Sequence, residues 1–235
     1  MRLLLLSNTK NPGAPALAHA EGAIKDLLGA RRRSVLYVPY ATVMWSWDES
    51  AVTMRAVFER MGLACESVHT AADPAAAVER AEAVFVGGGN TFQLLRALYD
   101  TRLISALRER VRAGMPYIGA SAGTNVVCPT IKTTNDMPII EPPTFDALSL
   151  VPFQINPHYT EARLEGHGGE TRDDRIAEFL RVNPGVYVVG LREGTMLRVD
   201  GSEARLIGAR TARVFYGGRA SVECGAGDSL EFLFS

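Results

Sequence analysis

The segment PYIGASAG, residues 116–123, leads from a short apolar run into a serine between two glycines. The apolar run predicts a buried strand, and the GxSxG pattern after it is typical of a tight strand-to-helix turn. Such a turn exposes the serine hydroxyl and aims backbone amides at a developing oxyanion. The segment therefore predicts an α/β fold in which Ser121 is a nucleophile. The competing interpretation is a tight turn that buries an ordinary serine.

Similar apolar runs alternate with helical patterns on both sides of this segment. The apolar runs cover residues 3–6, 34–40, 64–68, 83–86, 151–155 and 186–191. The helical patterns cover residues 16–28, 48–61, 75–81, 91–113 and 172–182, with Thr91 as the expected N-cap of the fourth. Near-continuous apolar strands between helices predict a doubly wound, mostly parallel sheet with helices on both faces.

The last forty residues have a different pattern. Short alternating segments at residues 196–199, 204–207, 212–215 and 221–224 are separated by glycines. They predict a small antiparallel β meander over about residues 195–235. A chain of 235 residues is within the usual size of one domain, so residues 1–235 are expected to form a single α/β domain with this extension.

The composition excludes several classes of protein. Hydrophobic residues make up 47% and the net charge is −1, with no basic block beyond residues 31–33, so neither nucleic acid nor a membrane is an expected partner. The apolar run at residues 3–6 is shorter than the ~7–15 residues of a signal-peptide core. The three cysteines are widely spaced, which favours a reducing compartment. We expect a cytoplasmic protein.

Three reactive side chains follow predicted strands: Ser121, His158 and Glu193. Ligand sites in open α/β sheets lie outside the carboxyl ends of the strands. A serine needs an adjacent base, and His158 is the histidine that directly follows a strong strand; His19, His69 and His167 are weaker candidates. The carboxylate behind the base is either Glu193, which geometry favours, or Asp136 in a polar loop.

A glycine-rich turn follows the run at residues 83–86. Its functional interpretation is an oxyanion donor, with the amide of Gly88 or Gly89 paired with that of Ala122. A phosphate cradle is the weaker alternative, because neither GxGxxG nor GxxxxGK[ST] is matched. No HExxH pattern is present and the histidines are scattered, so no metal or other cofactor is expected.

Taken together, these motifs resemble peptidase E, the family of α-aspartyl dipeptidases. The resemblance extends over nearly the whole chain and is carried by residues 3–8, 87–95, 119–125, 128–139, 145–148, 154–158 and 165–172. It implies a flavodoxin-like fold related to class I glutamine amidotransferases and hydrolysis of dipeptides with an N-terminal aspartate. Ser121 and His158 match the family's nucleophile and base, whereas both Asp136 and Glu193 have been assigned as the third member.

Selection of an aspartate requires a cation in a restricted pocket. Arg172 is the first candidate, because its planar fork suits a carboxylate and it ends a glycine-rich loop, residues 166–172, that could close over substrate. The resemblance points to the same residue, and Lys132 is a second candidate. The acceptors considered for the substrate's α-amine are Asn90, Gln154 and Glu170.

Two other functions compete with an Asp-X dipeptidase. One is an exopeptidase on aspartyl polymers, as in cyanophycinase-like relatives, and the other is a non-catalytic protein that binds an acidic metabolite. The intact serine, histidine and carboxylate argue against the second. A homodimer is the expected assembly, from its frequency among oligomers and from the resemblance.

Overall fold

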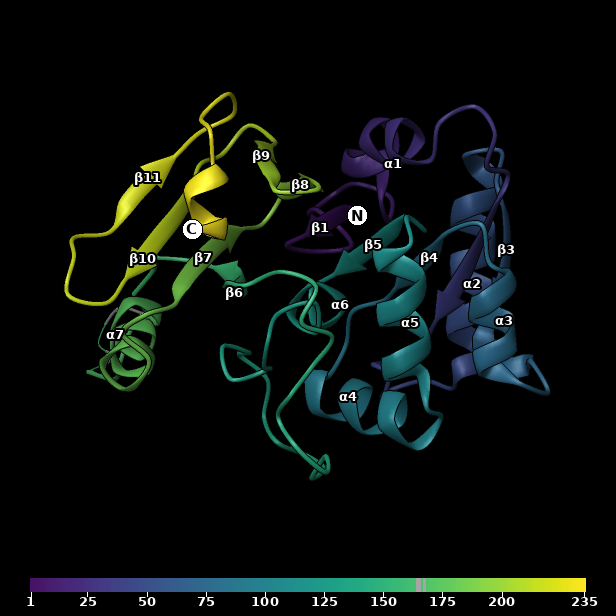
Figure 1. Cartoon of the computed structure of the whole chain (residues 1–235), viewed down its shortest axis with the longest axis horizontal. Coiled ribbons are helices and arrows are strands. Elements are labelled where there is room, and N and C mark those ends of the chain that lie inside the picture. The colour runs from purple at the N-terminus through teal and green to yellow at the C-terminus, as the bar shows by residue number, and fades with distance from the viewer. Residues whose placement is uncertain (164–165, 167) are drawn as a thin grey trace.

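Two β-sheets organise the chain in the computed structural model, which describes residues 1–163, 166 and 168–235 (Figure 1). The larger sheet has seven strands, of which the first five in sheet order are parallel and the last two are antiparallel additions beside β1. The predicted mostly parallel α/β sheet is therefore confirmed. In sheet order its strands are β3 (Ala64–Ser67), β2 (Ser34–Val38), β4 (Val84–Val86), β5 (Tyr117–Ala120), β1 (Arg2–Leu6), β8 (Met196–Asp200) and β9 (Glu203–Ile207).

Helices cover both faces of this sheet. Side chains alternate between the faces of a strand, so Leu4 of β1 shares a buried cluster with Phe58, whereas Leu5 shares one with Leu107 on the other face. The first face carries α1 (Glu21–Leu28) and α2 (Trp47–Arg60). The second carries α3 (Pro74–Arg80), α4 (Thr91–Asp100), α5 (Leu103–Arg112) and α6 (Ala122–Asn125).

The prediction of a single helix over residues 91–113 is wrong, because the structure has two helices there. Arg102 has a φ of 59°, in the left-handed region, which separates α4 from α5. The expected N-cap is also displaced by one residue. Asn90 is the N-cap, and its Oδ1 accepts hydrogen bonds from the amides of Phe92 and Gln93. Thr91 is the first helical residue.

The second sheet has four strands in the order β11-β10-β7-β6. β6 and β7 are parallel, whereas β10 is antiparallel to both of its neighbours, β7 and β11. Helix α7 (Arg172–Val182) packs on it through Ile176 and Leu180. Its strands are β6 (Gln154–Tyr159), β7 (Tyr187–Arg192), β10 (Ala212–Tyr216) and β11 (Val222–Cys224).

This second sheet corrects two predictions. The apolar runs at 151–155 and 186–191 were expected in the parallel sheet, but the strands that contain or follow them lie in the second sheet. The predicted meander over 195–235 is not one unit either, because β8 and β9 extend the larger sheet while β10 and β11 extend the smaller. The reason is that β8 pairs antiparallel with β1 and so occupies the edge that a further parallel strand would need.

The two sheets share one apolar core. Ile155 and Leu191 of the second sheet belong to the same buried cluster as Leu5 and Leu197 of the first. Three short 3-10 helices complete the described structure, at Ala18–Ala20, Val68–Thr70 and Glu231–Phe234. Within the described ranges, no helix combines the length and the apolar character needed to cross a membrane.

Candidate active site

Ser121 lies in the sharp turn between β5 and α6. Its backbone has φ 53° and ψ −109°, a strained conformation of the kind found at nucleophile turns. Both flanking glycines are required by the close approach of other main-chain atoms. A Cβ on Gly119 would lie 2.5 Å from the carbonyl oxygen of Gly123, and one on Gly123 would lie 2.0 Å from that of Val86. The GxSxG spacing therefore has a direct steric explanation.

A continuous chain of hydrogen bonds runs from this serine to a carboxylate. His158 Nε2 lies 2.8 Å from Ser121 Oγ, and His158 Nδ1 lies 2.7 Å from Glu193 Oε1. The side chains of His158 and Glu193 are 39% and 47% exposed, so substrate can reach them. An imidazole held between a hydroxyl and a carboxylate can accept the serine proton, with its positive charge stabilised by the carboxylate.

His158 and Glu193 are positioned by two residues at the end of β1. The backbone of His158 has φ 54° at an irregularity in β6, and its amide donates to Ser7 Oγ at 2.9 Å. The Ser7 hydroxyl, fully buried, donates to the carbonyl of Leu191 at 2.7 Å. The amide of Gly194, next to Glu193, donates to Asn8 Oδ1 at 2.8 Å. Sequence reasoning missed Ser7 and Asn8, although they too directly follow a strand.

Asp136 occupies a different place from Glu193. Its Oδ2 accepts hydrogen bonds from the amide of Thr91 at 2.7 Å and from its hydroxyl at 2.5 Å, at the N-terminus of α4. Unpaired amides and the helix dipole favour a carboxylate there. Both ring nitrogens of His158 already have partners in Ser121 and Glu193. The geometry therefore favours Glu193 as the carboxylate behind the base.

Three backbone amides, in the glycine-rich turn after β4 and in the turn after β5, are available to an oxyanion. The amide of Asn90 donates to the carbonyl of Ala41, but in the described part of the chain no protein acceptor is found for the amides of Gly88, Gly89 and Ala122. Gly88 lies directly beside the serine, since a Cβ there would be 3.1 Å from Ser121 Cβ. Preorganised amides at such a position stabilise a tetrahedral intermediate.

Arg172 is the first residue of α7, beside a cavity of about 230 Å³ that Glu170 and Arg175 also line. Burial and the neighbouring Arg175 lower the pKa of its guanidinium, whereas Asp136 raises it. Arg172 therefore lies within electrostatic reach of Asp136, whose side chain is bonded to the N-terminus of α4. A half-buried guanidinium of this kind is a good site for a carboxylate.

The other predicted substrate ligands differ in burial and in whether their polar groups already have hydrogen-bond partners. Gln154 is buried, and its amide contacts Thr130 and Thr133, so it is closed to substrate. Asn90 uses its Oδ1 as the cap of α4 and its Nδ2 on the carbonyl of Met137. Lys132 is exposed. Glu170 lies in the Arg172 cavity and pairs with Arg175 at 3.6 Å. His167, which belongs to the 166–172 loop, lies outside the described residues.

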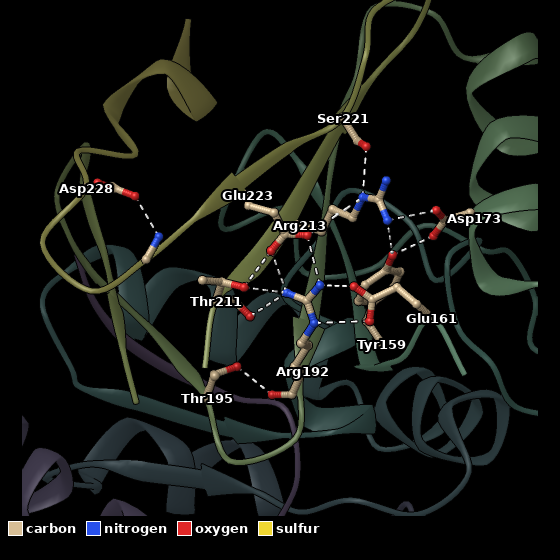
Figure 2. A network of polar contacts seen from close by, with 11 residues as sticks. Tyr159, Glu161, Asp173, Arg192, Thr195, Thr211, Arg213, Ser221, Glu223 and Asp228 are labelled. Carbon is tan, nitrogen blue, oxygen red and sulfur yellow. Dashed lines mark hydrogen bonds and ion pairs between the residues drawn. The ribbon is translucent and has the colours of Figure 1, made fainter. Parts of the chain in front are cut away.

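A network of charged side chains lies on the second sheet, next to His158 and Glu193 in the chain (Figure 2). At its centre is Arg192, whose side chain is 8% exposed and pairs with both Glu161 and Glu223. The two bonds to Glu223 are 2.8 and 2.9 Å long. Hydrogen bonds from Arg192 are the largest cause that lowers the pKa of Glu223 to about 2, and they raise the pKa of Arg192.

A second part of the network joins β6, β10 and α7 (Figure 2). Asp173 accepts a hydrogen bond from Tyr159 Oη at 2.5 Å and pairs with Arg213 at 3.1 Å. Burial, followed by this hydrogen bond, raises the pKa of Tyr159. Tyr159, Arg192 and Asp173 are the chain neighbours of His158, Glu193 and Arg172, respectively. The network therefore holds the backbone on which the three candidate site residues stand.

Two solved structures have the same fold as this chain. A peptidase from an acI-B1 Actinobacterium superposes with a TM-score of 0.69 at 17% identity, covering 97% of this chain and 96% of that one. A putative peptidase E protein from Listeria monocytogenes gives 0.58 at 21% identity, covering 92% and 98%. At these identities the likeness establishes the fold alone.

Sequence comparison establishes the family. Residues 3–207 match Peptidase family S51. Peptidase E of Nostoc sp. is 48% identical over 232 residues, which are 99% of this chain and 96% of that protein. Peptidase E of Salmonella typhimurium is 48% identical over 227 residues, 97% and 99% of the two chains. Because these matches cover nearly all of its length, the chain belongs to peptidase family S51.

Proposed function

We propose that this protein is a serine dipeptidase that hydrolyses dipeptides with an N-terminal aspartate. The observation that carries the proposal is the hydrogen-bonded chain from Ser121 through His158 to Glu193. It combines a hydroxyl on a strained turn, a base within reach of its proton and a carboxylate that orients the base. Membership of a peptidase family gives that chemistry a peptide bond as its target.

In the proposed reaction, Ser121 Oγ bonds to the carbonyl carbon of the N-terminal aspartate while its proton passes to His158 Nε2. The amides of Gly88 or Gly89 and of Ala122 bind the oxyanion. His158 then gives the proton to the leaving amine, the peptide bond breaks and an aspartyl ester remains. Water, deprotonated by His158, attacks this ester, and the proton returns to Ser121. Glu193 stabilises the imidazolium in both halves of the cycle.

Arg172 is the proposed partner of the aspartate side chain. Its guanidinium is partly desolvated, so a substrate carboxylate gains more from pairing with it than it would in water. An uncharged asparagine would leave that charge unpaired, which is a costly mismatch. Selectivity for Asp-X over Asn-X should therefore be large, and Arg172→Lys should weaken it because lysine lacks the planar fork.

The test is hydrolysis of Asp-Leu, Glu-Leu and Asn-Leu by the wild type and by Ser121→Ala. We expect kcat/KM for Asp-Leu to exceed that for Asn-Leu by a factor of about 100 or more. Ser121→Ala should lose activity by a factor of about 1,000 or more. Equal hydrolysis of Asp-Leu and Asn-Leu would reject the aspartate pocket, and an active Ser121→Ala variant would reject the serine mechanism.

A further inference from the structure

A second cavity adjoins Ser121 and shares no lining residue with the Arg172 cavity. It has a volume of about 490 Å³ and lies between α2 and the carboxyl ends of β2 and β4. Gly88 is one of its lining residues, and a Cβ on Gly88 would be 3.1 Å from Ser121 Cβ. The cavity therefore begins within one residue of the serine, although nothing in the proposed reaction so far uses it.

The two cavities are built from different parts of the fold. Tyr37, Met54 and Phe85 line the second cavity and belong to the buried cluster on the α1 and α2 face. The Arg172 cavity is instead lined by residues between 160 and 175, from the segment after β6 and the start of α7. Because the N-terminal aspartate is proposed to pair with Arg172, the second cavity, which adjoins Ser121 through Gly88, is left for the residue on the other side of the cleaved bond.

The lining of this cavity is mainly apolar. Its aromatic side chains are Tyr37, Trp45 and Phe85. Two of its hydroxyl groups satisfy each other, since Tyr37 Oη lies 2.7 Å from Ser50 Oγ. A leaving residue that buries an apolar side chain here gains hydrophobic free energy and breaks no hydrogen bond to the wall.

Charge disfavours an acidic occupant. In the described part of the chain, no lysine or arginine is among the lining residues, whereas Glu49 is. The Glu49 carboxylate accepts hydrogen bonds from the amide and hydroxyl of Ser46 at 2.8 and 2.9 Å, which stabilises its ionised form. A second carboxylate in the same cavity would be repelled.

The loop before α2 gives an independent indication that something covers this wall. Val43, Met44 and Trp45 are consecutive and 51%, 87% and 67% exposed. Adjacent exposed apolar side chains are a feature of binding surfaces. A side chain that enters the cavity would cover part of Trp45, which supplies the outer wall.

We propose that this cavity is the subsite for the leaving residue and that it selects large, uncharged apolar side chains such as leucine and phenylalanine. The inference rests on the proposed dipeptidase activity and extends it to the residue after the cleaved bond. It predicts that Asp-Leu and Asp-Phe are hydrolysed about tenfold more efficiently than Asp-Gly, and that Asp-Glu falls below Asp-Gly.

The decisive variant fills the cavity from an exposed position. Thr53 lies on α2 and lines the cavity, so Thr53→Trp should lower the ratio of kcat/KM for Asp-Leu to that for Asp-Gly about tenfold. Val52→Trp is the matched control, because Val52 is its neighbour on the same helix, is 64% exposed and is not among the lining residues. The control should keep the wild-type ratio.

Removal of the outer wall gives a second, milder test. Trp45→Ala should lower the same ratio about threefold to fivefold, mainly through KM, because part of the apolar contact is lost. In the Ser121→Ala background, calorimetry should show Asp-Phe binding more tightly than Asp-Gly, with the difference reduced by Trp45→Ala.

The outcomes separate the two proposals. If Asp-Leu is hydrolysed but Thr53→Trp leaves the ratio of Asp-Leu to Asp-Gly unchanged, the subsite is wrong and the dipeptidase stands. The same conclusion follows if Val52→Trp lowers the ratio as much as Thr53→Trp. If no Asp-X dipeptide is hydrolysed, both the proposed function and the proposed subsite are wrong.

Discussion

Ser121 and His158 are hydrogen-bonded to each other, but the two halves of the site that carry them are held by different forces. The serine half consists of β5, Ser121 and α6, and its contacts are buried and largely made by the main chain. Tyr117 Oη donates to the carbonyl of Gly123 at 2.6 Å, and Thr124 Oγ1 donates to that of Leu6 at 2.7 Å. Tight packing of this kind tolerates almost no added volume.

The histidine half consists of β6, β7 and the start of α7, with the charge network of Figure 2 behind them. Its acidic members are partly exposed, with side-chain exposures of 43% for Glu161 and 47% for Glu223. Ion pairs between such groups depend on pH and salt, whereas main-chain packing does not. Ser121 is therefore held in place by steric fit and His158 by electrostatic contacts, so each half should fail under a different perturbation.

The largest effect is expected from a methyl group in the serine half. Gly123→Ala places a Cβ 2.0 Å from the carbonyl oxygen of Val86, which forces the turn between β5 and α6 away from β4. We expect a loss of about 3 kcal/mol or more in the free energy of unfolding, measured by urea denaturation, together with loss of activity. Gly22→Ala is the control, because that helical glycine has nothing within 4 Å of its Cβ position. Equal stability of the two variants would contradict the steric account.

The next largest effect is expected from a change in Glu193, the carboxylate of the histidine half. Glu193→Gln removes the charge that faces His158 Nδ1, so kcat for Asp-Leu should fall about a hundredfold or more. Asp136→Asn weakens the cap of α4 and should cost about 1 kcal/mol of stability, with a smaller effect on kcat. A larger loss of kcat in Asp136→Asn than in Glu193→Gln would reverse the assignment.

A smaller effect is expected where the network meets α7. Asp173→Asn breaks the ion pair with Arg213 and loosens the turn that carries Arg172. We expect KM for Asp-Leu to rise about threefold to fivefold while kcat stays within about twofold, since Arg172 is proposed to bind the substrate and takes no part in the chemistry. Glu178→Gln on the exposed side of α7 should leave both constants unchanged. A fall in kcat alone would assign Asp173 a different role.

The smallest effect concerns pH. The pKa of Glu223 is lowered from 4.5 to about 2 in the folded protein, so its ion pairs stabilise the fold fully above about pH 4.5 and are lost as the pH falls toward 2. Glu223→Gln should therefore flatten the decrease in stability between about pH 6 and about pH 3, as measured by urea midpoints. An identical decrease in both proteins would show that Glu223 contributes nothing to acid sensitivity.

Much of this arrangement could be predicted from the sequence, because buried strands and strand ends have local signatures. The apolar run before Ser121, the glycines around it and the placement of His158 and Glu193 after strands all follow from short-range patterns. The structure brings these three side chains together. The sequence leaves Glu193 and Asp136 open, because either carboxylate could reach the histidine from a loop, and the hydrogen bond from His158 Nδ1 to Glu193 favours the first.

Other features could not be predicted because they depend on the partners that distant segments find. A buried apolar strand has the same sequence pattern in either sheet, so the pattern does not predict that β6 and β7 lie in the smaller sheet. The break between α4 and α5 at Arg102 could not be predicted either, because neither glycine nor proline marks that position. The prediction of Gln154 as a substrate ligand is wrong because Thr130 and Thr133, which are distant in the sequence, satisfy its amide group.

The order of the strands along the chain has a consequence for synthesis. Strand β5 and its parallel neighbours come from the first 120 residues, whereas Glu223, which pairs with Arg192, lies on β11 (Val222–Cys224). Chains that fold as they leave the ribosome fold their N-terminal parts first. We therefore expect the turn at Ser121 to form early and His158 to become fixed only after β11 has been synthesised. A nascent chain would then carry no competent peptidase until β11 has left the ribosome.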